Sequence, residues 1–526
     1  MGEPNYPHMS KRFYLTTAID YVNGQPHLGH AYEKIITDVI ARARRSLGEE
    51  VFFLTGLDEH GQKVEQAAVA QGKTARAYCD ELAQTWRAFT AKLNLTNNDF
   101  VRTTEPRHRE IVQAGLSKVN ASGQVYKKIY RGFYSTKEET FLTEKDRRPD
   151  GTFDPSYGNV VELEEENYFF KLRDHQSWLI DYIEKNPAFV RPDYRRNEVL
   201  GFLKNNVLED LCISRPVSRL SWGIPLPFDP NYVTYVWFDA LVNYISIPAA
   251  HGDPVVRSSL NLQPLNPDPQ LSLWPADLHV IGKDILKFHA VYWPIMLKAM
   301  GLPMPRQILV HGWWQKDGQK MSKSTGNVVD PVAVIDEWGL DAFRFYVLRE
   351  LDIGPDGNWT DAGFRARYSA ELANGLGNLV NRSLSMLKRY RNGVVPARSN
   401  ELASDAGKVI ESTRAAMEQN ELQAVLQSIW SLITRANQYV DQTAPFKLAK
   451  DPAQAKRLDE VLYNLAEICR VLAVLLWPFL PDTSVKIYAQ LGLPAVPDKF
   501  SMANWGGLAA GQQIGEPAPL FPRKDA

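Results

Sequence analysis

A strand-like hexapeptide that leads into a histidine-containing helix start is the feature that most constrains the fold of this 526-residue chain. Residues 12–17 (RFYLTT) are β-branched and aromatic, and a turn-rich loop joins them to PHLGH at residues 26–30. A proline favours the first position of a helix, so we expect a helix to start at His27. The N–H groups there suit phosphate, and Gly29 lets a nucleotide approach the backbone closely. His27 and His30, nearly one turn apart, can both donate hydrogen bonds to phosphate oxygens.

A second phosphate-handling sequence, KMSKS, occupies residues 320–324. Lys320 and Lys323 lie three residues apart beside the small hydroxyl residue Ser322, and such a basic loop can neutralise charge on a departing pyrophosphate. Alone, a histidine pair at a helix start is usually a half-exposed surface feature, and a Lys/Ser pentapeptide is usually a solvated loop. Together the two sequences indicate one nucleotide site built from distant parts of the chain.

The composition is typical of a globular protein with several domains. Hydrophobic residues make up 44% and charged residues 23%, and the length exceeds that of one ordinary core. Sixty Lys and Arg residues oppose 61 Asp and Glu residues, so any polyanionic partner must meet a local patch. No apolar run reaches membrane-spanning length, and residues 1–12 lack the apolar core of a secretory signal. We therefore expect a cytoplasmic protein without a membrane partner.

Alternating strand and helix patterns predict an α/β fold. Strand, helix, strand, helix follow one another over residues 11–100, and strand patterns return at 232–239 (YVTYVWFD), 278–281 and 307–311. This alternation predicts a Rossmann-type parallel sheet with its site at the carboxyl ends of the strands. Residues 115–227 break the alternation with short strands and charge-rich turns, and they read as an inserted subdomain.

The chain becomes helical in pattern from about residue 360. Helices predicted near 365–391, 404–442 and 452–477 suggest an all-α bundle. We accordingly divide the chain into the first half of the catalytic domain (1–114), an inserted connective subdomain (115–227), the second half of the catalytic domain (228–325), a connecting region (326–360), and a helical domain with its tail (361–526).

The HLGH and KMSKS sequences resemble the two signatures of class I aminoacyl-tRNA synthetases, and the residues around them resemble the methionyl-tRNA synthetases of that class. The resemblance extends from about Phe13 to the PLFPR sequence near the C-terminus. It implies a split Rossmann-type catalytic domain followed by an anticodon-binding bundle, with residues 326–360 contacting the tRNA stem. It also implies that ATP, with Mg²⁺, activates L-methionine to methionyl-adenylate, and that the methionyl group passes to tRNA(Met), the initiator tRNA included. The residues that would bind ATP are His27, Gly29, His30, Lys320, Ser322 and Lys323, with His27, His30, Lys320 and Lys323 acting in catalysis.

The cysteines argue against a protein-bound zinc ion. Cys79, Cys212 and Cys469 are too far apart to form a C-x-x-C site. Many methionyl-tRNA synthetases carry cysteine knuckles in the insertion, but here Ser135 and Glu138 stand where the first knuckle would have cysteines. We therefore expect the metal-free form of the insertion.

The resemblance also predicts an amino-acid pocket. A flexible thioether gains from apolar walls and sulfur–aromatic contacts, while Tyr and His can offer one polar contact to the sulfur. Without the resemblance, the aromatic residues near Trp237 read as core, and Asp58 reads equally well as the N-cap of a helix from Gly61. With it, Asp58 would hold the ammonium group of the substrate. Asp20 departs from the family pattern, and exposure to solvent would accommodate its charge. The residues that match the family's methionine site are Ile19, Tyr21, Asp58, Trp237, Ala240, Tyr244, Ile285 and His289.

Three residues of the helical region match the family's anticodon contacts. Asn378 and Arg382 match an Asn-x-x-x-Arg element suited to unstacked base edges, although such a polar stripe is usually a solvated face. Phe446, in Ala-Pro-Phe, replaces the usual tryptophan and keeps an aromatic ring for base stacking.

Arg215 matches a family position near the active site, but an arginine in a proline-flanked turn is usually structural.

Three alternative functions remain open. The nearest is a class I synthetase of another amino-acid specificity. A nucleotidyltransferase with an H-x-G-H sequence is usually much shorter and has no need of a helical bundle. A catalytically silent tRNA-binding protein is disfavoured because both signatures are intact. The sequence ends soon after the predicted bundle, without the dimerisation module of some relatives, so we expect a monomer.

Overall fold

The structure, a computed structural model, has at its centre a seven-stranded sheet in which every pair of neighbouring strands is parallel. It describes residues 11–22, 24–135, 140–142, 146–265, 272–321, 326–494 and 496–524. The strand order is β2–β3–β1–β13–β14–β8, and β4 pairs with β3. Strands β1, β13 and β14 are buried almost throughout, as expected for parallel strands covered on both faces. The strands are β1 (Arg12–Thr17), β2 (Asp20–Tyr21), β3 (Glu50–Asp58), β4 (Asp99–Arg102), β8 (Val190–Arg191), β13 (Leu278–Gly282) and β14 (Ile308–His311).

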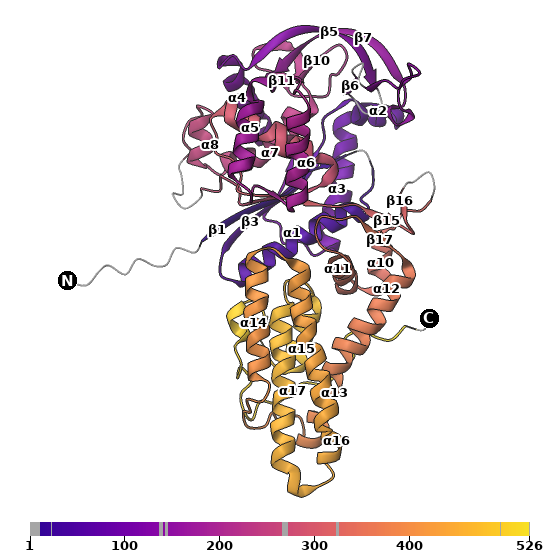
Figure 1. The fold of residues 1–526 in the computed structure, drawn as a ribbon, viewed down its shortest axis with the longest axis vertical. Coiled ribbons are helices and arrows are strands. Elements are labelled where there is room, and N and C mark those ends of the chain that lie inside the picture. Colours follow the sequence, from indigo (N-terminus) through magenta and orange to yellow (C-terminus); the bar gives the residue numbers. More distant parts are fainter. Residues whose placement is uncertain are drawn as a thin grey trace, which may run out of the picture.

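Helix α1 (Leu28–Ser46) lies between this sheet and the helical domain (Figure 1). His27 is its N-cap rather than its first residue, so the proline of PHLGH lies outside the helix. Nearly every residue of α1 is buried, because it contacts β1, β3 and β13 as well as α11 and α14. Further helices of this part are α2 (Gln62–Ala70), α3 (Ala75–Lys92), α4 (Pro106–Ala121), α7 (Val236–Ala250), α8 (Pro254–Ser259) and α9 (Trp293–Met300).

The predicted strand at 232–239 is wrong in both extent and partner. Strand β12 (Asp229–Thr234) ends early and pairs antiparallel with β10 (Ser214–Pro216) and β11 (Pro225–Leu226), outside the central sheet. Helix α7 then begins at Val236. Because α7 is buried on nearly every side, its sequence is mostly apolar, and a short apolar run does not distinguish helix from strand.

A twisted antiparallel sheet forms the far end of the α/β part (Figure 1). It consists of β6 (Thr140–Leu142), β5 (Val125–Ser135), β7 (Val160–Phe170) and β9 (Leu211–Cys212) in that order. The segment predicted as one insertion is more complex, because it also holds α5 (Gln176–Lys185), α6 (Asp193–Asn205) and β8, which pairs with β14. The chain thus returns to the central sheet once within residues 115–227.

A small mixed sheet and two helices connect the α/β part to the bundle. Strand β15 (Trp314–Lys316) pairs with β16 (Gln319–Lys320) and β17 (Gly357–Trp359). Helices α10 (Pro331–Trp338) and α11 (Leu340–Arg349) follow the KMSKS segment.

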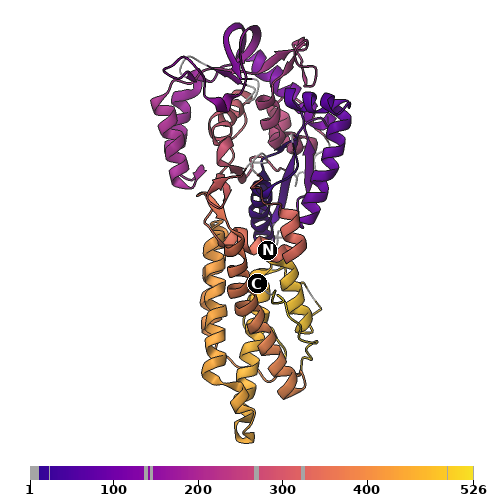
Figure 2. The same ribbon diagram turned by 90° about the vertical axis from the view of Figure 1, so that its right-hand side faces the viewer.

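The C-terminal part is a helical bundle that extends away from the α/β part and gives the molecule an elongated shape (Figure 2). The predicted helix at 404–442 is in fact two helices, α14 and α15, separated at Asn420, whose φ of 60° is left-handed. Among the described residues, no helix is long and apolar enough to cross a membrane. The elements are α12 (Asp361–Arg367), the π-helical η7 (Tyr368–Gly377), α13 (Asn378–Arg391), α14 (Ala403–Glu418), α15 (Leu422–Thr443), α16 (Pro445–Leu448), α17 (Ala455–Leu476) and α18 (Pro481–Gln490).

Two buried ionic clusters secure this arrangement. Arg344 of α11 pairs with Asp38 of α1 at 2.8 Å and donates to the carbonyls of Pro478 and Phe479, between α17 and α18. Glu467 of α17 accepts hydrogen bonds from the N–H groups of residues 506–508 and thereby holds the C-terminal segment against the bundle. The Rossmann-type fold with a helical C-terminal domain is confirmed.

Candidate active site

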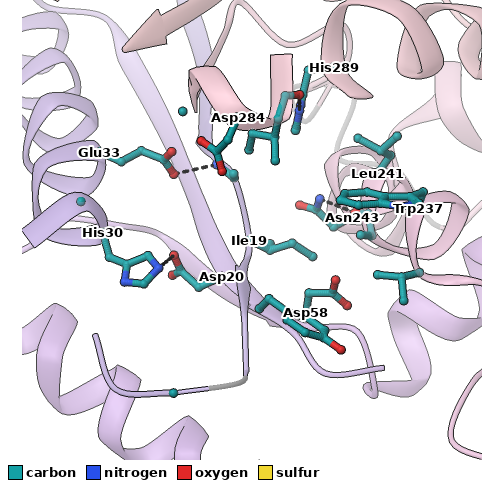
Figure 3. Close-up of a pocket in the computed structure, with 18 of the residues that line it drawn as sticks. Ile19, Asp20, His30, Glu33, Asp58, Trp237, Leu241, Asn243, Asp284 and His289 are labelled. Atoms are coloured by element: carbon teal, nitrogen blue, oxygen red, sulfur yellow. Dashed lines mark hydrogen bonds and ion pairs between the residues drawn. The ribbon is translucent and has the colours of Figure 1, made fainter. Parts of the chain in front are cut away.

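A cavity of about 590 Å³ opens at the carboxyl ends of β1, β2, β3, β13 and β14 (Figure 3). This is the edge at which a parallel sheet of this type places its ligands. The structure brings together here three of the four HLGH residues and all eight predicted methionine-site residues: His27, Gly29, His30, Ile19, Tyr21, Asp58, Trp237, Ala240, Tyr244, Ile285 and His289.

The two histidines of HLGH form a reciprocal cap at the start of α1. Nδ1 of His27 accepts from the N–H of Gly29 at 3.1 Å, and Nδ1 of His30 accepts from the N–H of His27 at 3.2 Å. A neutral imidazole that accepts at Nδ1 carries its proton on Nε2. Both rings therefore offer an Nε2–H donor. A side chain at Gly29 would lie 3.0 Å from the His27 ring, so glycine keeps this cap in place.

Asp20 is buried, contrary to the expectation that it points to solvent. Its carboxylate is 2.5 Å from the ammonium group of Lys34 and 3.9 Å from Nε2 of His30, and the residue is 7% exposed. Burial raises the pKa of Asp20 to about 6, because it outweighs the attraction of Lys34. Lys34 follows His30 by one helical turn, but nothing in its sequence context predicted this partner.

Glu33 connects three elements around the cavity. One carboxylate oxygen accepts from the N–H of Ala18 at 3.1 Å, and the other lies 3.1 Å from Nε2 of His311. Nδ1 of His311 lies 2.8 Å from the carbonyl of Gly312. Burial alone lowers the pKa of His311, but the hydrogen bond and the charge of Glu33 outweigh it and raise the pKa. The ends of β1 and β14 are thereby fixed to α1.

The end of the pocket predicted to hold the thioether contains a hydrogen-bonded pair, Tyr244 and His289. The hydroxyl of Tyr244 is 2.7 Å from Nε2 of His289, whose Nδ1 is 2.9 Å from the carbonyl of Ile285. Burial lowers the pKa of His289 to about 4, so the ring is neutral at physiological pH. A neutral ring that donates from Nδ1 to a carbonyl accepts at Nε2, so Tyr244 is the donor. Trp237 completes this wall by stacking on Phe288 at 3.5 Å.

Asp58 ends β3 and faces the cavity (Figure 3). The alternative role as a helix N-cap is wrong, because Gly61 is the N-cap of α2 and no side chain caps that helix. Among the described residues that line the cavity, Lys63 is the single Lys or Arg. Sequence reasoning did not single out Lys63, nor Asp284, which accepts from the indole N–H of Trp313 at 3.1 Å.

The KMSKS segment lies largely outside the described residues. Lys320 pairs through its backbone with Gln315 in the β15–β16 hairpin, whereas Ser322 and Lys323 belong to the part of the chain not described. Trp313, immediately before β15, lines the cavity, so the hairpin starts at its edge. The approach of both lysines to a nucleotide stays a prediction.

Other expectations have mixed outcomes. Arg215 is buried, with its guanidinium 3.9 Å from the ring centre of Tyr235, which supports the structural interpretation. Glu138 of the expected metal-free insertion lies outside the described residues. Within the described parts of the chain, no group of three or more His, Cys, Asp or Glu residues could hold a metal ion.

The residues predicted to contact the anticodon lie in the bundle, away from the cavity. Asn378 and Arg382 are half-buried on α13, and Arg382 is 3.3 Å from Asp441 of α15. Phe446 lies on the short helix α16, which follows α15 directly, and is 46% exposed. One exposed aromatic ring and one half-exposed guanidinium group thus occur in the same part of the bundle.

Comparison with known proteins identifies the family. The model for class I tRNA synthetases (M) matches residues 13–152 and 155–384, and the model for the anticodon binding domain of methionyl tRNA ligase matches residues 391–525. Methionine–tRNA ligase from Bacillus subtilis is 41% identical over 99% of this chain and 79% of its own length, and that from Rickettsia felis is 41% identical over 98% and 99%. The Mycobacterium tuberculosis methionyl-tRNA synthetase in complex with methionyl-adenylate superimposes with a TM-score of 0.90 at 38% identity, covering 98% of this chain and 100% of that one. The chain combines the class I signatures, a split parallel sheet and a methionyl-type anticodon domain, and the similarity extends along nearly its whole length. It therefore belongs to the methionyl-tRNA synthetase family.

Proposed function

We propose that this protein activates L-methionine with ATP to methionyl-adenylate and transfers the methionyl group to tRNA(Met), including the initiator tRNA. The observation that carries the proposal is the single cavity lined both by the HLGH residues and by the eight residues that match the family's methionine site. A phosphate-binding helix start and an apolar pocket with one acidic residue are the two parts that such a reaction brings together.

The chemistry follows from positioning. The carboxylate of methionine attacks the α-phosphorus of ATP and displaces pyrophosphate, so no protein nucleophile is required. Asp58 holds the ammonium group, and the Nε2–H groups of His27 and His30 donate to phosphate oxygens. Lys320 and Lys323 stabilise the departing pyrophosphate, and Mg²⁺ arrives with the nucleotide. Orientation and fixed charge supply the rate enhancement.

The helical domain supplies tRNA recognition in this proposal. Asn378 and Arg382 contact base edges of the anticodon, and Phe446 stacks on an unpaired base. We retain the division into five regions, with boundaries after residues 114, 227, 325 and 360. Strand β8 lies within the second region but pairs with β14 of the central sheet. We further propose that the enzyme acts as a monomer in the cytoplasm, where its aminoacyl-tRNA product is used.

ATP–pyrophosphate exchange, run separately with each amino acid, tests the specificity. We expect exchange with methionine alone at low substrate concentration. Exchange that is faster with another amino acid would assign the chain to a different specificity, and its absence with every amino acid would contradict the enzymatic function.

Replacing Lys323 tests the role of the KMSKS loop. We expect Lys323→Ala to lower kcat for exchange by about a hundredfold and to change the KM for methionine by less than about threefold, because the ammonium group acts on charge that develops in the transition state. Lys316→Ala, in the same hairpin, is the matched control and retains activity. A large rise in the methionine KM of Lys323→Ala would move this lysine into the amino-acid site.

A further inference from the structure

A buried relay of two histidines and one aspartate lies behind the amino-acid pocket. One carboxylate oxygen of Asp239 is 2.6 Å from Nδ1 of His60, and the other is 2.7 Å from Nε2 of His108. Nδ1 of His108 is 3.0 Å from the hydroxyl of Ser246. All four side chains are more than nine-tenths buried, and none of them lines the cavity.

The relay joins the two sides of the predicted methionine site. Asp239 lies in the first turn of α7, between the pocket residues Trp237 and Ala240. His60 follows Asp58 by two residues, immediately after the end of β3. The contact between Asp239 and His60 therefore connects the apolar wall of the pocket to the strand end that carries its acidic residue.

Glu59, between Asp58 and His60, is bonded to residues at the end of β4, whereas His60 is bonded to α7. Glu59 accepts from Nε of Arg102, the last residue of β4, at 2.6 Å. It also accepts from the hydroxyl of Thr104, two residues further along. Its carbonyl accepts from the indole N–H of Trp222 at 2.6 Å. With Glu59 held towards β4 and His60 held towards α7, the backbone at Asp58 has little freedom to move.

We infer that Asp239 is a positioning residue for the amino-acid substrate: through His60 it fixes the distance between the apolar wall on α7 and Asp58. The inference rests on the proposed function, because it takes Asp58 as the group that holds the ammonium of methionine. A substrate that spans both contacts binds well only if their separation matches its length. His108, on α4, holds the second oxygen of Asp239 and so fixes the first turn of α7 from behind.

The carboxylate is suited to this role because it accepts from two donors at once. Burial raises the pKa of Asp239, but the charges and hydrogen bonds of His60 and His108 outweigh it and lower the pKa to about 2. The group is therefore ionised at every pH at which the enzyme works. An asparagine side chain has one acceptor oxygen and one amide donor, so Asp239→Asn removes the negative charge and makes one imidazole either face an N–H group or change its tautomer.

Exchange kinetics and binding of the Asp239→Asn variant test the inference. We expect the KM and the calorimetric Kd for methionine to rise by about ten- to hundredfold, the range for losing a buried charged hydrogen bond. The KM for ATP should change by less than about twofold. The desamino analogue of methionine makes no contact with Asp58, so its inhibition constant should also change by less than about twofold.

Two further histidine variants make the test independent of any single replacement. His60→Ala removes the donor and should raise the methionine KM as Asp239→Asn does, whereas His60→Asn keeps an N–H near the position of Nδ1 and should restore it to within about threefold of wild type. The double variant Asp239→Asn/His60→Ala should be no worse than the poorer single variant, because both remove the same contact. If Asp239→Asn does not fold, the two His60 variants alone decide.

Asp253→Asn is the matched control. Asp253 is equally buried and accepts from the N–H groups of Val255, Val256, Leu273 and Trp274, away from the cavity. It should lower the melting temperature without changing the methionine KM. Relay variants that behave like Asp253→Asn, or that weaken methionine and its desamino analogue equally, overturn the inference. Wild-type enzyme that does not activate methionine contradicts the proposed function instead.

Discussion

Burial shifts the pKa of two side chains that line this cavity in opposite directions. His289 is neutral because burial lowers its pKa to about 4, while Asp20 titrates near 6 because burial raises its pKa. His289 and Tyr244 together present a fixed proton arrangement, with no net charge, to the predicted thioether site. A pocket of this kind binds an apolar side chain equally well over a wide pH range.

The contribution of His289 to the methionine affinity should therefore be independent of pH between about 5 and 8, instead of following the ordinary histidine pKa of about 6.5. Because the pKa of His289 is lowered in the folded state, the unfolded chain takes up the proton first, and folding stability falls as pH drops below about 6.5. The affinity that depends on this ring falls only as pH approaches 4. Calorimetric titration with methionine between about pH 4 and 8, with His289→Gln as the control, measures this change, and urea unfolding at the same pH values measures the stability. A binding midpoint near 6.5 that is present in the wild type and absent from His289→Gln would contradict the neutral-histidine arrangement.

At the residue scale, the sequence predicted the cavity lining but not the partners of its charged groups. His27, Gly29, His30 and the eight predicted methionine-site residues line the cavity, whereas the placement of the KMSKS lysines beside it stays a prediction. Glu33, Lys34 and Lys63 were missed, because no local sequence pattern marks them. The partner of Glu33, His311, lies 278 positions away in the chain, so only the folded structure brings the two together.

At the scale of elements, α1 is shared between the two parts of the molecule. Its N-terminal end carries the HLGH residues, and its middle holds Asp38, which pairs with Arg344 of α11. Arg344 is fully buried and also binds two carbonyls between α17 and α18. This guanidinium group therefore joins helix α1 to the bundle.

Replacing this arginine should destabilise the protein strongly. Arg344→Ala leaves Asp38 buried and deprived of one of its two arginine partners, which costs about 3–5 kcal/mol in comparable cases. Urea unfolding measures the loss, and Lys408→Ala, an exposed change on α14, should stay within about 0.5 kcal/mol of wild type. A loss below about 1 kcal/mol for Arg344→Ala would show that the junction does not depend on this pair.

The buried strands of the central sheet were predicted well, whereas the start of one helix and the break between two others were not. The strands at 12–17, 278–281 and 307–311 were predicted correctly to within a residue or two. The first turn of α7 was mistaken for strand because the aromatic and β-branched residues that precede Asp239 are also typical of a strand. The break at Asn420 was missed, because an asparagine in a helical pattern is common and the turn depends on its left-handed backbone.

At the scale of the whole molecule, the candidate active-site cavity and the predicted anticodon contacts lie in different parts of an elongated structure (Figure 2). The α/β part contains the whole cavity, while Arg382 and Phe446 belong to the bundle. Amino-acid activation and tRNA recognition should therefore be separable by mutation.

Phe446→Ala should lower kcat/KM for tRNA aminoacylation by about tenfold or more, because stacking on one base contributes about 1–3 kcal/mol. ATP–pyrophosphate exchange should stay within about twofold of wild type. Val485→Ala removes another exposed apolar side chain of the bundle, on α18, and should leave both activities unchanged. Equal losses of exchange and aminoacylation in Phe446→Ala would place this ring outside anticodon recognition.

Because Glu467 accepts hydrogen bonds from residues 506–508, the stability of the bundle depends on the C-terminal segment. Arg470 and three backbone N–H groups surround that carboxylate, and the hydroxyl of Tyr368 bonds to the carbonyl of Pro522 further along. Truncating the polypeptide before residue 505 strips an interior anion of three of its donors. Residues 506–524, although almost without regular secondary structure, therefore take part in the packing of the bundle.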